Sequence, residues 1–263
     1  MRKTARRWRN GGCVAALLCL LGAAPAAEVA PSGTLRVAIA ISPAPSAFWA
    51  VRDPASGQPR GVAVDLGRAL AKRLGVPVQL VVYDNSGKIT QAGESGGWDV
   101  AFLPVDAERR QALAVGPNYS VSDSTFLVPA GSSIQTLAEV DRPGVRVFGI
   151  GGTTTARAAA GWLKHTTVTE RPSVEALVAL VKAGQADAIA LDRESLAGLM
   201  PDLPGARILA GHFHVLEDAV AVPKDHPLAL AAVTAFMTAA KADGTVRKAL
   251  DDAGLRDAQV APP

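Results

Sequence analysis

Apolar runs that suit buried strands alternate with amphipathic stretches that suit helices along most of the chain. The predicted strands lie at residues 35–40, 78–83, 98–103, 145–150 and 184–192. The predicted helices lie at residues 61–75, around Ile89, and at residues 156–164 and 174–182. This alternation predicts an α/β fold in two similar halves, each with a parallel-rich sheet flanked by helices.

Two further apolar segments are predicted to join the halves. Residues 126–129 lie between them, and residues 218–223 follow the second half. Segments in these places suit a two-strand hinge that carries the chain out of the first lobe and back again. The expected organisation is a first lobe formed by residues 27–122 and 218–263 and a second lobe formed by residues 123–217.

The first residues have the composition of a secretory signal. Five basic residues precede an apolar stretch at residues 13–24, which ends in the small residue Ala24, and a second small residue, Ala26, follows with one residue between them. The apolar stretch is shorter than the roughly 20 residues that a membrane-spanning helix needs. We therefore expect residues 1–26 to be a signal peptide cleaved near Ala26, and the mature chain to be periplasmic. The Arg6-Arg7 pair leaves open whether export uses the general or the twin-arginine route.

Removal of this segment changes the charge balance. The whole chain has 27 basic and 24 acidic residues, and the segment contains five of the basic ones, so 22 basic and 24 acidic residues remain. A slightly acidic mature chain gives no support for nucleic-acid binding. Both cysteines, Cys13 and Cys19, also lie in the segment. The mature chain therefore has no disulfide and no thiol nucleophile.

The junction of an apolar strand with a helix start at residues 99–110 places a charge where ligands bind. Asp106 is placed as the helix N-cap, and Arg109 follows one turn later. Parallel α/β sheets bind ligands beyond the carboxyl ends of their strands. The planar guanidinium of Arg109 at this edge suits a carboxylate, although a solvated helix charge is the alternative for a lone arginine.

Other constellations predict little chemistry. His212 and His214 could lie on one face of a strand, but no acidic or cysteine partner is evident for a metal site. The glycines at residues 149–152 lack the third glycine of a dinucleotide loop, because Thr154 stands in its place. No nucleophile elbow or phosphate-binding loop is present. We expect neither a cofactor nor a metal.

Seven short motifs follow one another through nearly the whole mature chain. They are GTLRVA from residue 33, GVAVDL from residue 61, GWDV from residue 97, AERR from residue 107, GTT from residue 152, AGQADA from residue 183 and KADGT from residue 241. In this order they resemble family 3 of the periplasmic solute-binding proteins of ABC transporters, the polar amino acid type. The resemblance implies the two-lobed periplasmic binding protein type II fold, in which the lobes close over a small ligand.

The resemblance also implies a set of ligand-binding residues. Arg109 matches the arginine that pairs with the ligand α-carboxylate, and Thr154, with Thr153 and the first amides of the following helix, matches the second anchor for that group. Asp192 matches the acid that accepts the α-ammonium. From local sequence alone, the threonines equally suit a helix cap, and Asp192 suits a solvated ion pair with its neighbours.

The remaining expected site residues are apolar. Phe48 or Trp49 matches the aromatic residue that covers the ligand in relatives, and Leu103 makes the strand end more apolar than is usual for polar amino acid receptors. Relatives commonly have Thr or Ser where this chain has Pro104. Proline has neither a hydroxyl nor an amide donor, so the ligand pose is expected to differ.

The function that the resemblance implies is the substrate-binding component of an ABC importer, which is not an enzyme. Its expected partners are a small carboxylate, most simply an amino acid, and an inner-membrane permease, and the chain is expected to be a monomer. Two alternatives remain open. One is an enzyme similar to cyclohexadienyl dehydratases, with Asp192 or Glu194 and a histidine as the acid–base pair. The other is a sensory or accessory binding module with an altered pocket.

Overall fold

The computed structural model describes residues 26–41 and 46–262, so the expected signal peptide lies outside the described residues except for its last position. The helices are α2 Val62–Leu74, α3 Ser86–Glu94, α4 Ala107–Ala112, α5 Leu137–Val140, α6 Thr154–Trp162, α7 Val174–Lys182, α8 Arg193–Leu199, the short 3-10 helix η1 Met200–Asp202, α9 Pro227–Ala242 and α10 Thr245–Asp252. None of the helices in the described ranges is both long and apolar enough to cross a membrane.

Most strands join one long sheet. The strands are β1 Leu35–Ala40, β2 Val51–Arg52, β3 Pro59–Arg60, β4 Val78–Tyr83, β5 Val100–Val105, β6 Leu113–Val128, β7 Val147–Ile150, β8 Val168–Arg171, β9 Ala188–Asp192, β10 Arg207–Ile208, β11 His214–Pro223 and β12 Gln259–Val260. The main path runs in the order β4-β1-β5-β11-β6-β9-β7-β8. Strands β1, β4 and β5 are parallel in one half, and β7, β8 and β9 are parallel in the other.

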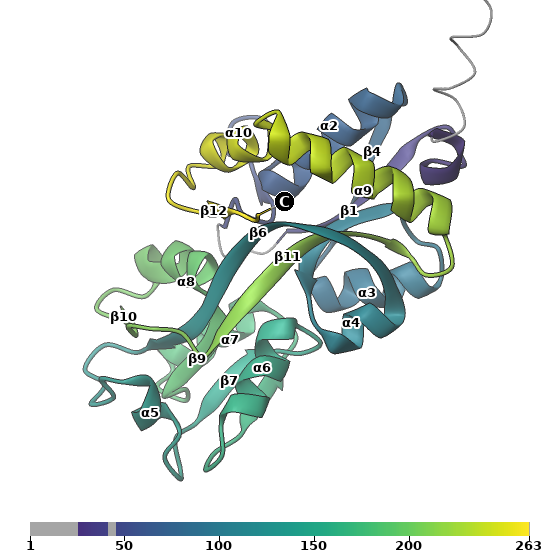
Figure 1. Ribbon diagram of the computed structural model, residues 1–263. Helices are drawn as coiled ribbons and strands as arrows, with labels where there is room; N and C mark the ends of the chain where they lie inside the picture. Colours follow the sequence, from purple (N-terminus) through teal and green to yellow (C-terminus); the bar gives the residue numbers. More distant parts are fainter. Residues whose placement is uncertain (1–25, 42–45, 263) are drawn as a thin grey trace, which may run out of the picture.

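Strands β6 and β11 connect the two halves. They pair antiparallel with each other, β11 also pairs with β5, and β6 also pairs with β9. In Figure 1 these two long strands run from the upper body of the molecule into the lower one. The molecule therefore has two lobes, and the predicted α/β class with parallel-rich sheets is confirmed. The lobe boundaries expected at residues 122/123 and 217/218 fall within these two strands.

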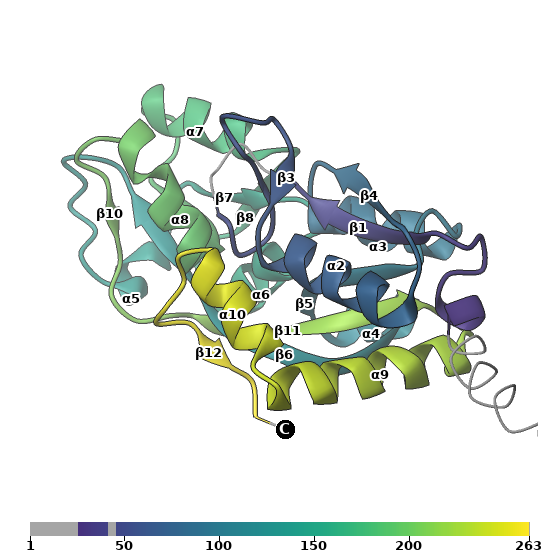
Figure 2. The same cartoon turned by 90° about the horizontal axis from the view of Figure 1, so that it is seen from above.

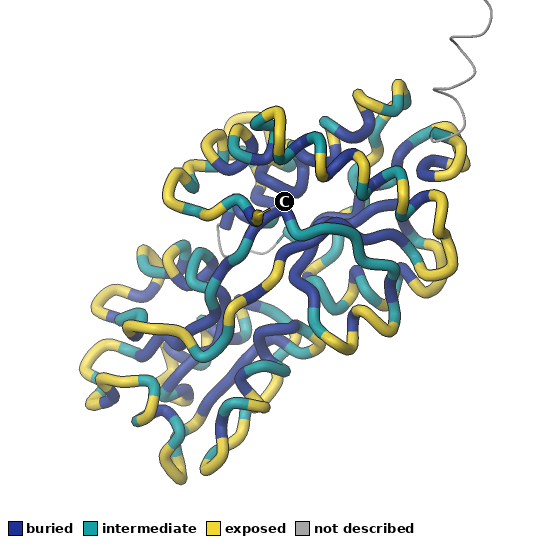
Figure 3. Tube along the Cα trace, in the orientation of Figure 1, coloured by how far each residue is buried: buried dark blue, intermediate teal, exposed yellow. Residues whose placement is uncertain are grey.

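In each lobe, helices cover both faces of the sheet. In lobe 1, α2, α9 and α10 pack on one face and α3 and α4 on the other, and Figure 2 shows α2, α9 and α10 next to one another. In lobe 2, α7 and α8 cover one face and α5 and α6 the other. The strands are consequently buried on both sides, as the dark central trace in Figure 3 shows, and this explains their nearly continuous apolar sequences.

Several elements have the bounds that the local sequence pattern predicts. The predicted strands at residues 35–40 and 78–83 and the predicted helix at residues 174–182 have these same bounds in the structure. Helix α2 ends at Gly75, whose φ of 70° is the left-handed conformation that glycine adopts without strain.

The position expected for the hinge is wrong for its first strand. Residues 126–129 do not cross between the lobes, because Phe126 and Leu127 pair with β9 inside lobe 2 and pack in its core. The crossing lies upstream, where β6 contains Ser120, Ser122 and Ser124 opposite the first half of β11. These serines interrupt the apolar pattern, so hydrophobicity alone does not reveal the crossing strand.

Candidate functional site

A cavity of about 70 Å³ lies between the two lobes. It is bordered by the carboxyl ends of β1, β4 and β5 in lobe 1 and of β7 and β9 in lobe 2, which is the edge where parallel sheets bind ligands. Its lining consists of Ala40, Trp49, Ala63, Asp84, Asn85, Ser86, Ile89, Phe102, Leu103, Pro104, Ile150, Thr153, Thr154, Thr155, Val174, Leu191, Asp192 and Ser195. Most of these side chains are apolar, and the polar ones come from both lobes.

Asp192 provides a buried carboxylate in this lining. It ends β9 and caps α8, because its Oδ1 accepts a hydrogen bond of 2.9 Å from the Ser195 backbone N–H. Its Oδ2 accepts a long hydrogen bond of 3.4 Å from the indole Nε1 of Trp49 in lobe 1. Burial raises the pKa of Asp192, although these hydrogen bonds oppose the shift. The carboxylate is therefore left with spare acceptor capacity beside the cavity.

The N-terminus of α6 forms a second polar part of the lining. Thr153 is the N-cap: its Oγ1 accepts from the Ala156 backbone N–H at 3.2 Å and donates to the Ile150 carbonyl at 2.7 Å. Thr154 begins the helix and is buried. The first amides of a helix have no intrahelical acceptor and carry a partial positive charge. This end of α6 is therefore a neutral donor site that favours a negative group.

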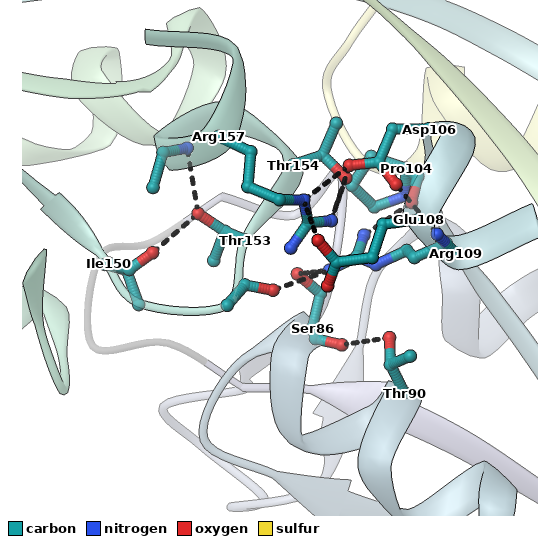
Figure 4. A network of polar contacts seen from close by, with 12 residues as sticks. Ser86, Thr90, Pro104, Asp106, Glu108, Arg109, Ile150, Thr153, Thr154 and Arg157 are labelled. Carbon is teal, nitrogen blue, oxygen red and sulfur yellow. Dashed lines mark hydrogen bonds and ion pairs between the residues drawn. The ribbon is translucent and has the colours of Figure 1, made fainter. Parts of the chain in front are cut away.

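Arg109 lies behind the cavity wall and is only 1% exposed. Its Nη1 donates to the Pro104 carbonyl, and its Nη2 donates to Ser86 Oγ at 2.8 Å and to the Gly152 carbonyl at 3.3 Å (Figure 4). Its buried Nε has no hydrogen-bond partner among the residues that the structure describes. Burial, together with the positive charge of Arg157, lowers the pKa of Arg109 to about 10, so the guanidinium remains charged at neutral pH. Arg109 thus positions two residues that line the cavity, Ser86 and Pro104.

A charged seam beside Arg109 joins the lobes. Arg157 of α6 in lobe 2 reaches Asp106 Oδ2 at 2.9 Å and Glu108 Oε2 at 3.1 Å, both at the start of α4 in lobe 1 (Figure 4). Asp106 also caps α4 by accepting from the Arg109 backbone N–H, as the sequence predicted. Partial burial acts to raise the pKa of Asp106, but the hydrogen bonds from Arg109 and Arg157 outweigh it and the pKa is lowered.

The seam also contains a close approach of two backbones. A Cβ atom placed on Gly87 would lie 2.8 Å from the Gly152 carbonyl oxygen of the other lobe, so only glycine fits here without a shift. The Asn85 side chain donates across the same boundary to the Pro172 carbonyl at 3.4 Å. Together with the Arg157 pairs, these contacts show that the structure is the closed form, with the lobes touching.

Two acids near Asp192 were not expected in the ligand site, because the sequence analysis did not name Asp218 and named Glu194 only as an acid–base candidate for the enzyme alternative. Asp218 on β11 is fully buried, and its Oδ2 accepts from Ser122 Oγ at 2.9 Å while its Oδ1 has no partner in residues 26–41 and 46–262. Glu194 in α8 is partly buried, and its Oε2 is buried without a partner from the described residues. Burial, and then the negative charge of Asp192, raises the pKa of Glu194 to about 7. The pKa of Asp218 is raised well above its usual value, first by burial and further by the charges of Asp192 and Glu194. The available signal was an acid at the head of the apolar run at residues 218–223.

The structure brings together five of the seven expected ligand-binding residues, and these line the cavity: Trp49, Leu103, Thr153, Thr154 and Asp192. The other two, Phe48 and Arg109, do not line it. Phe48 is 1% exposed in the lobe 1 core, where its ring centroid is 4.7 Å from that of Trp49. The ligand contacts assigned to the seven residues remain predictions.

The two histidines considered for a metal site do not lie on one strand, because His212 precedes β11 and His214 begins it. His212 Nδ1 is 4.0 Å from Asp123 Oδ2, and its side chain is half exposed. Among the described residues no group of three potential metal ligands is present.

Residues 35–253 match the family of bacterial extracellular solute-binding proteins, family 3. Because the match spans most of the chain, this protein belongs to that family. A known relative is the glutamine-binding protein of an ABC transporter from Bacillus subtilis (strain 168), which is 21% identical over 201 residues covering 75% of this chain and 73% of the relative.

Solved structures with the same fold include binding proteins for amino acids. An ancestral amino acid-binding protein, described as a precursor of cyclohexadienyl dehydratase, superposes with a TM-score of 0.73 at 26% identity, covering 86% of this chain and 98% of its own. An amino acid ABC transporter substrate-binding protein from Streptococcus pneumoniae, bound to L-arginine, gives a TM-score of 0.74 at 22% identity with coverages of 88% and 98%. These neighbours confirm the two-lobed type II periplasmic binding fold.

Proposed function

We propose that this protein is the periplasmic substrate-binding component of an ABC importer and captures a small amino acid by closing its lobes. The observation that carries the proposal is the buried carboxylate of Asp192 in the wall of the interlobe cavity, together with the donor end of α6 in the same lobe. A negative group and a set of neutral donors are the two features that an α-ammonium and an α-carboxylate require. Family membership supports the same function.

In this proposal, capture uses both lobes in a fixed order of contacts. Lobe 1 supplies the apolar surface around Phe102 and Leu103 and the indole of Trp49. Closure then brings Asp192 and Thr154 of lobe 2 onto the ligand. A hydrogen bond to a charged group contributes about 1.5–3 kcal/mol, so the ligand supplies enough free energy to shift an equilibrium between open and closed lobes. No bond of the ligand is broken.

The role proposed for Arg109 is to fix the strand end of lobe 1. Its guanidinium bonds to Pro104, Ser86 and Gly152, and its buried Nε has no partner among the described residues, so a ligand carboxylate would reach it either at Nε or by replacing Ser86 Oγ or the Gly152 carbonyl. In either arrangement Arg109 sets the positions of Ser86 and Pro104, which border the ligand.

The proposed partners follow from the family. An inner-membrane permease would receive the ligand from the closed chain, and the chain is proposed to act as a monomer. The cavity is small, with about 70 Å³ of space between the lobes. A ligand with a short apolar side chain therefore fits the closed form better than a long one.

An enzymatic role has less support. The proposed acid–base pair required a histidine, and none lines the cavity in the described parts of the chain. The neighbour that is linked to a dehydratase is itself described as an amino acid-binding protein. Incubation of the protein with prephenate, followed by product detection, tests this alternative, and turnover above the rate of a heat-denatured sample would establish it.

The experiment that tests the proposed function is calorimetric titration of the mature chain with the common amino acids. We expect at least one with a short apolar side chain to bind, with a decrease in the radius of gyration in small-angle scattering if the ligand-free chain populates an open form. Native mass spectrometry of freshly purified protein shows whether a ligand copurifies. An empty protein that binds no amino acid would refute the proposal and favour an accessory module.

A further inference from the structure

The apolar part of the interlobe cavity lies where the cores of the two lobes meet. Lobe 2 contributes Ile150, Val174 and Leu191, which all belong to one core cluster. The lobe 1 lining includes Ala63 and Phe102 from the core on one face of its sheet and Ile89 and Leu103 from the core on the other. An apolar group in the cavity therefore packs against both lobes, and its fit depends on its size.

Val174 is a rigid part of this lining. It is the first residue of α7 and is 4% exposed, and Ser173 caps the helix by accepting from the Ala176 backbone N–H at 3.4 Å. Further along α7, Leu177 and Val181 are buried in the same core cluster. A β-branched side chain in a helix has one strongly preferred rotamer. The position of the Val174 side chain is consequently fixed by the packing of α7 on lobe 2.

The start of α7 is also held against lobe 1. The Asn85 side chain donates through Nδ2 to the Pro172 carbonyl at 3.4 Å, two residues before Val174. Its Oδ1 accepts from the Lys88 backbone N–H at 3.0 Å and so caps α3 in lobe 1. Asn85 and Val174 both line the cavity. In the closed form, this contact therefore sets how far Val174 lies from the lobe 1 wall.

The backbones beside this contact leave no room for adjustment. Gly87, two residues after Asn85, approaches Gly152 so closely that a Cβ atom on it would lie 2.8 Å from the Gly152 carbonyl oxygen. The lobes cannot move closer here to grip a short ligand. They also cannot separate for a long ligand without losing the hydrogen bond from Asn85 to Pro172. The space beside Val174 thus has a fixed size once the lobes are closed.

We propose that Val174 is a specificity-determining residue, which limits the length of the aliphatic side chain that an amino acid ligand can have in the closed cavity. The inference rests on the proposed function and adds a size limit to the same site. A ligand side chain that is too long collides with Val174 and separates the start of α7 from Asn85. One that is too short leaves unfilled space and loses packing contacts.

A homologous series of ligands measures the limit. The test is calorimetric titration of the mature wild-type chain with glycine, L-alanine, L-2-aminobutyrate, L-norvaline, L-norleucine and L-2-aminoheptanoate, in which the side chain grows by one carbon at each step. Each methylene that fits should raise the affinity by about fourfold. We expect the affinity to be highest at one length and to fall by at least about tenfold for the next longer ligand.

Two substitutions at Val174 should move this optimum in opposite directions. Val174→Ala removes two carbons from the wall, and we expect the optimum to move by one or two carbons to longer ligands. Val174→Leu adds one carbon, and we expect the optimum to move to a shorter ligand, with at least about a tenfold loss for the best ligand of the wild type. Val174→Leu keeps the core filled, so its result stands if Val174→Ala does not fold.

Val181→Ala is the matched control. Val181 lies two turns further along α7 in the same core cluster and is 8% exposed, but it does not line the cavity. This variant removes the same two carbons from lobe 2, so it should lower the thermal stability and leave the optimum length unchanged. Circular dichroism verifies that all three variants fold.

The outcomes separate this inference from the proposed function. The same optimum in the wild type and in the folded Val174 variants would overturn the inference and leave the proposed function intact. Equal shifts in Val174→Ala and Val181→Ala would also overturn it, as would a wild-type affinity that still rises at the longest ligand. A wild type that binds only amino acids outside the series contradicts the aliphatic limit alone. If it binds no amino acid of the series or of the wider panel, both proposals fail.

Discussion

The two sides of the cleft between the lobes differ in how fully their charges are paired. On the seam side, Arg109 and Arg157 meet Asp106, Glu108 and backbone carbonyls, and most of their donors are used. On the wall formed by β9, α8 and β11, by contrast, the acids outnumber the cations, and one oxygen each of Glu194 and Asp218 has no partner within the described part of the chain.

This difference in charge pairing indicates that one side acts in lobe closure and the other in ligand recognition. A seam in which Arg157 pairs with Asp106 and Glu108 across the lobes stabilises the closed form without needing a ligand, although the Arg109 guanidinium there bonds only to neutral acceptors. A wall of buried carboxyl groups with raised pKa values is stabilised by protonation or by a cation that arrives beside it. The seam therefore affects the equilibrium between open and closed lobes, and the wall determines which ligand binds between them.

The largest expected effect comes from removing one negative charge from this wall. Asp192→Asn is expected to lower the affinity for the best ligand by about a hundredfold, or about 3 kcal/mol, because a charge-assisted hydrogen bond inside a closed cavity is lost. Calorimetry measures the affinity. If this variant binds the ligand with the wild-type affinity, the wall does not recognise the ligand.

A methyl group at the seam tests closure separately from recognition. Gly87→Ala would place its Cβ 2.8 Å from the Gly152 carbonyl, so we expect the lobes to be held apart and the affinity to fall by about tenfold. Alanine also favours a helix over glycine, so thermal stability should not fall. Small-angle scattering measures the closed fraction. Gly161→Ala is the control, because its Cβ would meet nothing within 4 Å.

The pKa of Glu194 predicts how the wall affects stability with pH. Its pKa is raised from 4.5 to about 7, so between these pH values the folded chain binds more protons than the unfolded chain. The free energy of unfolding therefore falls as pH rises through this window, by about 1–3 kcal/mol from this group. Glu194→Gln should reduce the fall and make the chain more stable at pH 8, with little change at pH 4. Urea unfolding at several pH values measures the free energy of unfolding. A pH profile that is unchanged in the variant would contradict the raised pKa of Glu194.

The smallest expected effect comes from the ion pairs of the seam. Arg157→Gln removes partly exposed pairs with Asp106 and Glu108, and we expect a loss of about 1 kcal/mol in the closing equilibrium, seen as a several-fold lower affinity. Added salt should lower the ligand affinity of the wild type toward that of the variant. Arg110→Gln, which removes an exposed pair with Glu217 in the neighbouring strand, is the control. Identical affinities for wild type and Arg157→Gln at low salt would exclude a role in closure.

Sequence reasoning reached the parts of the molecule that local signals determine. The alternation of strands and helices, the glycine end of α2 and the Asp106 cap are properties of short segments, and the structure contains all three. The hinge was misplaced because β6 carries serines where a buried strand is expected to be apolar.

The candidate site was only partly accessible to the same reasoning. The motif order indicated Asp192 and Thr154, which line the cavity, but the partners of Arg109 depend on where Ser86 and Gly152 come to lie in three dimensions. Glu194 lies two residues after Asp192, but nothing local shows that Asp218, far away in sequence, is buried near both of them. Unpaired buried charges are a property of packing, so the sequence does not reveal them.

The central claim is that an ammonium group meets the acidic wall, and a crystal structure of the chain with its best-binding amino acid tests it most directly. The account predicts the ligand nitrogen within hydrogen-bond distance of Asp192 and the Arg109 guanidinium still bonded to Pro104 and Ser86. A ligand carboxylate bonded to Arg109, with its nitrogen away from Asp192, would contradict the account.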